Sequence, residues 1–127
     1  MARNTFRKHE HLCGKLRIRD VALTGAAVHV PPFKLVGKAM DLPTHAPAQI
    51  AFAVPRRNLK RAVDRNRVKR LMREAYRTNK NELYAKLEGR ANKIAWLVVY
   101  QGRADIDLRN TEQKITRALH RWLEQHG

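Results

Sequence analysis

The chain centres on the stretch Arg65-Asn66-Arg67-Val68-Lys69-Arg70-Leu71-Met72-Arg73, which places five basic side chains in nine residues. Its apolar residues recur at steps of three and four, and this spacing continues beyond it. The positions that share the spacing are Val68, Leu71, Met72, Ala75, Asn79 and Leu83. Such a period places residues on one face of an α-helix. It predicts a helix over about 61–87 with one buried stripe, ended by Gly89.

The charges of this predicted helix gather on the face opposite the apolar stripe. Lys69, Arg73 and Arg77 follow one another at four-residue intervals, and Arg70 lies on the adjoining flank. Residues 56–77 include ten Lys or Arg and only two acidic residues. Like charges four residues apart cost a helix a few tenths of a kcal/mol per pair, so an ordinary solvated helix intersperses acids. The pattern therefore favours a surface that binds a polyanion.

Overall composition agrees with this interpretation. The 127 residues include 27 Lys and Arg against 11 Asp and Glu, giving a formal net charge of +16. So much like charge destabilises a compact fold, and a polyanionic partner is the usual reason to keep it. Nucleic acid is the leading candidate and an anionic membrane surface the second. No apolar run approaches the roughly 20 residues needed to span a membrane, so we expect no membrane association.

The start of the chain and its cysteine usage bear on location. Cys13 is the single cysteine, so no internal disulfide can form, and residues 1–9 lack the apolar segment of a secretory signal. A cytoplasmic protein is the plain interpretation. The length suits one domain, 1–127, in which residues 1–14 form a basic, loosely held arm.

Three segments have the character of β-strands. Residues 33–40 alternate loosely after two prolines, residues 49–54 follow a turn-rich segment, and residues 94–100 form a nearly continuous apolar run. We expect the first two to pair as a hairpin. The third is apolar on both faces, so we expect it to lie centrally in the sheet, with Trp96 in the core.

Two further helices complete the prediction. A short helix is predicted from Lys15 to Leu23, and Gly25 ends it. Its predicted apolar contacts are Leu16, Val21 and Leu23. A closing helix begins at an N-cap, Asn110. Its predicted inner face consists of Ile115, Ala118, Leu119, Trp122 and Leu123. Helices and strands that intermix around one small sheet predict an α+β fold, a two-layer sandwich.

No group of side chains has the spacing of a catalytic or metal centre. Asp105 and Asp107 are spaced like metal ligands, but they precede a helix start, where the helix dipole favours acidic residues anyway. The six histidines do not cluster with cysteine or carboxylates. We therefore predict no catalytic residue and no metal ligand in the protein.

Two adjoining segments closely resemble the protein component of bacterial ribonuclease P. They are Phe52-Ala-Val-Pro-Arg-Arg57 and Ala62-Val-Asp-Arg-Asn-Arg-Val-Lys-Arg-Leu-Met-Arg-Glu-Ala-Tyr76. That family carries an Ala-Val-x-Arg-Asn-Arg-x-Lys-Arg-x-x-Arg signature after a strand that ends in a basic pair, so the match covers about 25 contiguous residues. The Thr5-Phe6 start and the Val54-Pro55 variant look like the version found in Bacteroidetes-type bacteria.

The resemblance implies a fold and a role. The fold is a small mixed sheet packed by helices, in α-β-β-β-α-β-α order with a left-handed βαβ crossover. The role is that of an RNA-binding subunit, which assists a catalytic RNA in removing the 5′ leader from precursor tRNA. The RNA performs the hydrolysis and binds most of the Mg²⁺, while the protein stabilises the RNA fold and grips the leader. No second protein partner is required.

The resemblance and the charge pattern together imply a set of site residues. The predicted RNA-binding residues are Arg56, Arg57, Arg61, Arg65, Asn66, Arg67, Lys69, Arg70, Arg73 and Arg77. Lys69 and Arg73 would border the cleft for the leader, where Phe33 and Phe52 are candidates for stacking on bases.

The chain also departs from the family at the leader cleft. Two aromatic positions on the family's first helix fall near Ile18 and Val21-Ala22 in this sequence, and an aromatic common on the first strand is Val36 here. Base stacking is worth about 1–3 kcal/mol per base, so leader contacts of a different construction are expected.

Three alternatives remain open on composition alone. A ribosomal-type protein that coats rRNA would share the charge, but the Arg-Asn-Arg signature favours ribonuclease P. A DNA-binding module would lay the basic helix in a major groove, yet no helix-turn-helix pair precedes Arg61 and no dimerisation seam is evident. An autonomous nuclease is disfavoured because the sequence shows no cluster of metal ligands.

Overall fold

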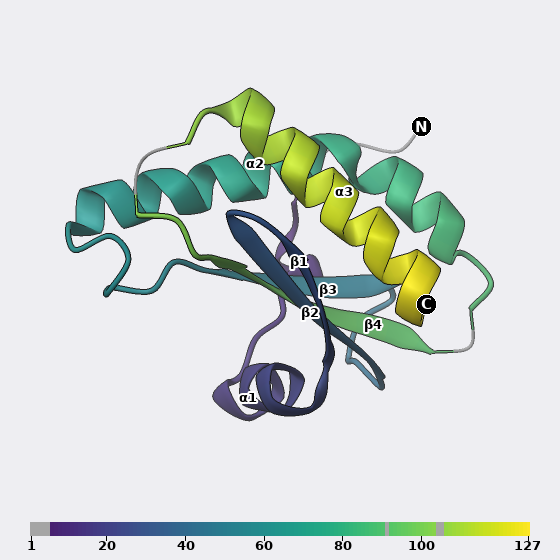
Figure 1. Cartoon of the computed structure of the whole chain (residues 1–127). Helices are drawn as coiled ribbons and strands as arrows, with labels where there is room; N and C mark the ends of the chain where they lie inside the picture. The colour runs from purple at the N-terminus through teal and green to yellow at the C-terminus, as the bar shows by residue number, and fades with distance from the viewer. Residues whose placement is uncertain (1–5, 91, 104–105) are drawn as a thin grey trace.

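The computed structural model describes residues 6–127 except residue 91 and residues 104–105 (Figure 1). In chain order its elements are η1 (Lys8–Glu10), α1 (Lys15–Thr24), β1 (Ala26–Val30), β2 (Phe33–Met40), β3 (Ala48–Ala53), α2 (Ala62–Leu87), β4 (Lys93–Tyr100) and α3 (Leu108–His126). The α-β-β-β-α-β-α order is confirmed, with one short 3-10 turn before it. The predicted long helix is confirmed as α2. The strand β1 was implied by the resemblance but not predicted from the local pattern.

The four strands form one mixed sheet in the order β1-β2-β4-β3. β1 pairs with β2 and β2 with β4 in antiparallel fashion, whereas β3 and β4 are parallel neighbours joined through α2. The predicted hairpin between residues 33–40 and 49–54 is therefore wrong. β4 lies centrally between these two strands, as expected, and its nearly continuous apolar run is buried on both faces of the sheet. The connection through α2 is the crossover that the resemblance describes as left-handed.

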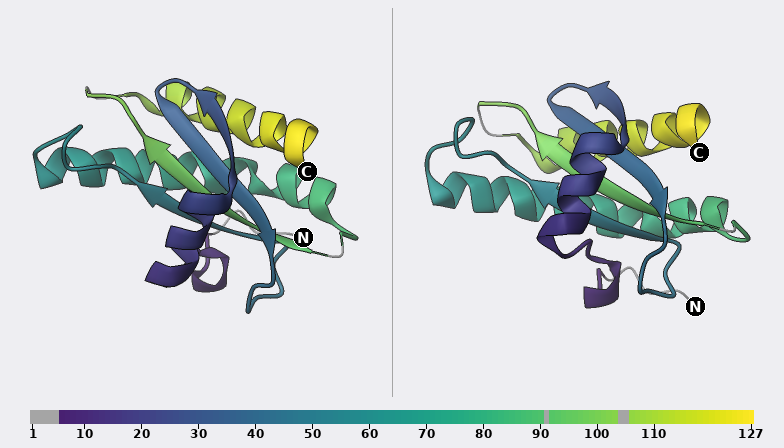
Figure 2. Two further views of the ribbon diagram at one scale, coloured as in Figure 1. Left: turned by 60° about the horizontal axis from the view of Figure 1, so that its bottom comes forward. Right: turned by 90° about the horizontal axis from the view of Figure 1, so that it is seen from below.

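Helices cover both faces of the sheet (Figures 1 and 2). α2 and α3 lie side by side on one face and form with it the predicted sandwich, which contains the larger core. α1 lies across the opposite face over a second, smaller core. Trp96 and Trp122 meet edge to face in the larger core, with ring centroids 5.8 Å apart. Gly37 permits this packing, because a Cβ there would lie 2.5 Å from both indoles.

The short helix α1 docks by a face that the sequence did not single out. Val21 is fully buried and Ile18 partly buried against Val36, while Leu16 and Leu23 are 82% and 72% exposed. The predicted contacts of Leu16 and Leu23 are therefore wrong. Residues seven apart share one face of a helix, and α1 rests on the opposite one. An ion pair between Asp20 and Lys38 on β2 (2.9 Å) fastens α1 to the sheet.

The arm before α1 is anchored rather than loosely held, as far as residues 6–14 are described. The Leu12 amide donates to the Ile50 carbonyl (2.9 Å), and Gln49 Nε2 donates to the His9 carbonyl (2.8 Å). Both partners belong to β3, the edge strand of the sheet. An open edge presents unpaired backbone groups, and the arm covers this one.

A buried ion pair completes the anchoring of the arm. Glu10 and Lys80 are 2% and 5% exposed, and Lys80 Nζ donates to both carboxylate oxygens, at 2.7 and 2.6 Å. The Tyr84 hydroxyl (2.7 Å) and the Arg7 amide (3.1 Å) also donate to this carboxylate. Burial raises the pKa of Glu10, but the hydrogen bonds from Lys80, Tyr84 and Arg7 outweigh it and hold the pKa below its ordinary value. Glu10 is therefore charged and fully partnered.

The buried stripe of α2 extends further toward this anchor than the spacing predicted. Val68, Met72, Ala75 and Leu83 are buried as expected. Leu71 and Asn79 are only partly buried, whereas the stripe takes in Tyr76, Lys80 and Leu87. A lysine in a core position carries no apolar signal in the sequence. It is buried here because Glu10 supplies the opposite charge.

The closing helix α3 is capped by Asp107, not by Asn110 as predicted. Asp107 Oδ1 accepts a hydrogen bond from the Asn110 amide at 2.7 Å, so Asn110 lies inside the first turn. The inner face is otherwise as predicted, except that Leu123 is only partly buried. A carboxylate at this position satisfies an otherwise unpaired amide.

The cap gives a first testable expectation. Asp107→Ala should lower the free energy of unfolding by about 1 kcal/mol, because the amides of the first turn lose their acceptor. Urea denaturation of the full chain measures this. Asp41→Ala, an exposed aspartate in the β2–β3 loop, is the matched control and should change the free energy by less than about 0.5 kcal/mol. Equal effects of the two substitutions would contradict a capping role.

Candidate RNA-binding surface

The loop between β3 and α2 holds Arg56 and Arg57 in an exposed turn. The Asn58 amide donates to the Pro55 carbonyl (3.0 Å), and Asn58 Nδ2 donates to the Tyr100 carbonyl at the end of β4 (3.0 Å). The turn is thus tied to the end of the sheet. Two arginines are presented from a fixed backbone.

Arg65 connects this loop to the first turns of α2. Its Nη1 donates to the carbonyl oxygens of Leu59 (2.9 Å) and Lys60 (2.7 Å). These carbonyls precede the helix and have no partner in its backbone ladder. Arg65 is therefore a positioning residue for the loop, in addition to being a predicted RNA contact.

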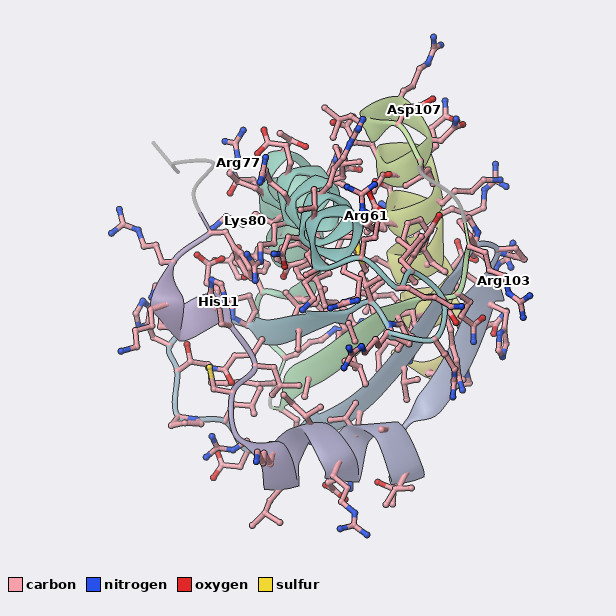
Figure 3. All side chains as sticks on the ribbon, turned by 90° about the vertical axis from the view of Figure 1, so that its left-hand side faces the viewer. His11, Arg61, Arg77, Lys80, Arg103 and Asp107 are labelled. Carbon is pink, nitrogen blue, oxygen red and sulfur yellow. The ribbon has the colours of Figure 1, made fainter. Side chains whose placement is uncertain are left out.

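The solvent-facing side of α2 displays most of the other predicted RNA-binding residues. Figure 3 views the helix nearly end-on from its N-terminus, with Arg61 in front. The residues that are exposed on this surface are Arg61, Asn66, Arg67, Arg70 and Arg73, and Lys69 is partly exposed. We call these residues, with Arg56 and Arg57, the arginine flank. A single rigid helix and its fixed loop therefore bring the predicted cations together.

Arg61 at the N-cap of α2 and Arg77 within the helix, both in the predicted set, form ion pairs with acidic residues of α2. Arg61 Nε lies 4.0 Å from Asp64 Oδ2 on the surface, a contact that contributes little. Arg77 is engaged more fully, because its Nε donates to Glu74 Oε2 (3.0 Å) and its Nη2 to the other oxygen of that carboxylate. The hydrogen bond from Arg77 lowers the pKa of Glu74. The charge of Arg77 is thus matched within its own helix.

Phe33 does not lie where a base could reach it. Its side chain is 0% exposed and packs in the larger core beside Tyr100, with ring centroids 5.4 Å apart. Alternation along β2 directs Phe33 and Leu35 toward α2 and α3, and Val36 toward α1. The prediction that Phe33 stacks on the leader is therefore corrected.

The positions that the resemblance assigns to the leader cleft do come together. Ile18 on α1 packs against the cluster that contains Val36 and Leu97 on the sheet. The partly buried hydrophobic side chains around this cluster are Ile18, Met40, Ala51, Ala53 and Val99. All are aliphatic. Among the described residues, this hydrophobic cluster therefore offers apolar contact without a Phe, Tyr or Trp ring.

Phe52 lies on the other face, in an aromatic cluster that the sequence did not predict. It is partly exposed and meets Phe6 and Tyr76 edge to face, with centroids 6.0 and 6.1 Å apart. Phe6 also stacks on His11, and the charge of Arg73 acts on His11. Phe52 and Arg73, both predicted to contact the leader, thus belong to one neighbourhood. Phe6 and His11 carry no periodicity that would have revealed them.

The acidic residues that were considered as metal ligands do not form a metal site in the described part of the chain. Asp107 caps α3, and Asp105 lies outside the described residues. Among the residues that the structure describes, no three of His, Cys, Asp or Glu gather as metal ligands would. No helix in the described part of the chain is long and apolar enough to cross a membrane.

A small mixed sheet that carries an exposed arginine-rich helix defines an α+β nucleic-acid-binding protein. The family model for ribonuclease P matches residues 6–125 of the chain. A ribonuclease P protein component from Chlorobium phaeobacteroides is 35% identical over 127 residues, covering 92% of this chain and 87% of its own length. A second, from Porphyromonas gingivalis, is 35% identical over 116 residues, covering 90% and 83%. The chain belongs to the ribonuclease P protein family and is thus a subunit of an endoribonuclease.

Solved structures agree on the fold. The ribonuclease P protein from Thermotoga maritima aligns with a TM-score of 0.69 at 18% identity, covering 88% of this chain and 96% of that one. The Staphylococcus aureus protein aligns with a TM-score of 0.67 at 16% identity, covering 89% and 94%. The sequence relatives come from Chlorobium and Porphyromonas, which agrees with the predicted resemblance to the Bacteroidetes-type version of the family.

Proposed function

We propose that the arginine flank binds the catalytic RNA of ribonuclease P and that the complex removes the 5′ leader from precursor tRNA in the cytoplasm. The observation that carries this proposal is the presentation of the cations. Arg65 and Asn58 fix the loop, the buried stripe fixes α2, and the arginines project from both into solvent. Guanidinium groups present a planar fork of donors that suits phosphate oxygens.

The flank is suited to binding phosphate and not to cleaving it. Arginine stays protonated at any physiological pH, so it is no general base, and a cationic surface repels Mg²⁺. We assign the hydrolysis and most of the Mg²⁺ to the RNA. The protein would then contribute by neutralising phosphates where the catalytic RNA and its substrate approach each other. No second protein is needed for this role.

Between the catalytic RNA and the leader we divide the contacts of the flank, together with Arg65 and Phe52, as the family signature implies. Arg65, Asn66, Arg67 and Arg70 would meet the catalytic RNA. Lys69 and Arg73 would border the leader, and Phe52 would lie beside it. The division is supported by position, because residues 69 and 73 follow at a four-residue step on the side of α2 that carries the buried Lys80 and the arm.

Reconstitution tests the proposed function. The protein freed of RNA should not cleave precursor tRNA, whereas it should restore cleavage by the catalytic RNA of the same genome at a Mg²⁺ concentration where that RNA alone is inactive. The physical reason is that the flank replaces part of the screening that Mg²⁺ otherwise provides. An unrelated protein of similar net charge is the control. Cleavage by RNA-free protein, or equal rescue by the control, would refute the proposal.

A further inference from the structure

The N-terminal arm places an aromatic pair next to the arginine flank. The rings of Phe6 and His11 are stacked, with centroids 3.8 Å apart and planes 20° apart. Phe6 in turn meets Phe52 and Tyr76 edge to face, at 6.0 and 5.5 Å. Tyr76 is buried, whereas Phe6, His11 and Phe52 are partly exposed. The cluster therefore runs from the core to the surface and ends at the arm.

The pair is held in place from both sides. His11 forms a parallel bridge with Ile50 on the edge strand, and the neighbouring Leu12 amide donates to the Ile50 carbonyl. On the other side of His11, Glu10 is locked to Lys80 in the interior. A ring fixed in this way loses little conformational entropy when a ligand stacks on it.

The charge of Arg73 reaches the ring of His11. Burial lowers the pKa of His11 and outweighs a hydrogen bond with the backbone of Phe6 that raises it; the charge of Arg73 lowers the pKa as well, and the charge of Glu10 raises it. The imidazole is therefore neutral near pH 7 while Arg73 is charged. In Figure 3, His11 on the arm and Lys80 and Arg77 on α2 all lie on the side of α2 away from Arg103. A neutral ring next to a guanidinium matches a nucleotide, whose base stacks and whose phosphate pairs.

The opposite face of the sheet does not offer this combination. Around α1, the partly buried hydrophobic side chains in the described chain are all non-aromatic. An RNA strand that needs a ring to stack on finds one at the arm, where the arginine flank begins. Single-stranded RNA exposes its bases for such stacking, while a duplex does not.

We propose that His11, stacked on Phe6 and flanked by Arg73, is a binding site for a base of single-stranded RNA. The proposal rests on the proposed function, since it takes the arginine flank as RNA-binding, and it adds a stacking site on the arm. The ring supplies stacking and Arg73 supplies the phosphate contact. The site thus extends the path of a single strand from α2 onto the N-terminal arm.

Two substitutions of His11 in the full chain distinguish the effect of its aromatic ring from the effect of side-chain size. The probe is a single-stranded oligoribonucleotide of about eight nucleotides with 2-aminopurine at its centre, a length within the range that one binding domain covers. His11→Leu keeps an apolar contact with Phe6 but removes the aromatic face, so the dissociation constant should rise about fivefold or more and the stacking-induced quenching should disappear. His11→Phe keeps the ring, and both observables should stay within about twofold of the unsubstituted chain.

Matched controls keep the outcomes distinct. His45 lies in the β2–β3 loop and its ring stacks on that of His9. His45→Leu removes this ring and should leave the affinity for the probe unchanged. Arg73→Ala should weaken binding of the probe.

The outcomes separate the stacking site from the arginine flank. If His11→Leu binds normally while Arg73→Ala binds weakly, the stacking site is overturned and the flank stands. If neither variant changes affinity, the flank itself is overturned for single-stranded RNA. Equal losses in His11→Leu and His11→Phe would also overturn a role for the ring.

A second measurement does not depend on the variants folding. Ultraviolet crosslinking of the unsubstituted protein to the same oligonucleotide, followed by peptide mapping, should place the adduct on residues 6–11. Adducts confined to α1 or to the α1 face of the sheet would overturn the site.

Discussion

Lys80→Met should lower the free energy of unfolding by about 3–5 kcal/mol, the usual loss when one partner of a buried ion pair is removed. Lys80 is 5% exposed and donates to both oxygens of the equally buried Glu10. Methionine preserves the apolar stem of the side chain, so the loss reports on the uncompensated carboxylate more than on packing. Urea denaturation at pH 7 gives the free energy. Lys86→Met, at an exposed position on the same helix, should change it by less than about 0.5 kcal/mol.

The pH dependence identifies the cause of that loss. In the unsubstituted chain the pKa of Glu10 lies below its ordinary value of 4.5, so this group stabilises the fold above about pH 4.5 and the stabilisation disappears as the pH falls through the folded pKa. Without Lys80, burial raises the pKa of Glu10. The difference between variant and parent should therefore shrink on acidification from pH 7 toward pH 4. A difference that stays constant over this range would show that lost packing, and not the buried charge, destabilises the variant.

A double substitution completes the cycle. Glu10→Gln combined with Lys80→Met removes both charges and should recover part of the stability lost by Lys80→Met alone. Burial raises the pKa of Tyr84, which keeps its hydroxyl protonated and able to donate to the residue at position 10. If the double variant were as unstable as the sum of the single ones, the two side chains would not be coupled.

Arg67→Ala together with Arg70→Ala should weaken binding of the catalytic RNA about 100-fold or more. Both residues are exposed on the arginine flank, and a hydrogen bond from a charged group contributes about 1.5–3 kcal/mol. The slope of log affinity against log salt should also become shallower by about 1.4–1.8, since each phosphate contact contributes about 0.7–0.9. Filter binding across a salt series measures both quantities. Unfolding by urea should be unaffected, because neither side chain belongs to a core.

A charge-matched control makes this test specific. Arg109→Ala together with Arg117→Ala removes the same charge from exposed positions of α3. If the affinity depends on the arginine flank, this control should cost far less than the flank variant. Equal losses in both variants would mean that net charge, and not the geometry of α2, determines binding.

The helices and the charged surface could be predicted from the sequence because their signals are local. The apolar period gave α2 with boundaries within one residue, and the same period placed Lys69 and Arg73 on one side. The N-cap of α3 was placed at Asn110 rather than Asp107, although both residues precede the predicted inner face by a distance that suits a cap. Aspartate and asparagine are equivalent in capping preference, so propensity could not choose between them.

The sheet order and the arm could not be predicted in this way. Which strand separates β2 from β3 depends on contacts distant in sequence, and a loose alternation at residues 33–40 carries no information about its neighbour. The alternation also does not reveal which face Phe33 takes. Glu10 and Lys80 are 70 residues apart, and each alone has the composition of an exposed residue. The two residues are buried only because they form an ion pair with each other.

This ion pair also determines when the arm can be anchored during synthesis. The arm leaves the ribosome before α2, so the carboxylate of Glu10 has no counter-charge until Lys80 emerges 70 residues later. Until then Ile50 and its neighbours form an uncovered strand edge, which is a template for wrong pairing between nascent chains. Fragments truncated before α2 would keep this edge open. The arm is thus secured only after α2 has been made, although it precedes α2 by some 50 residues.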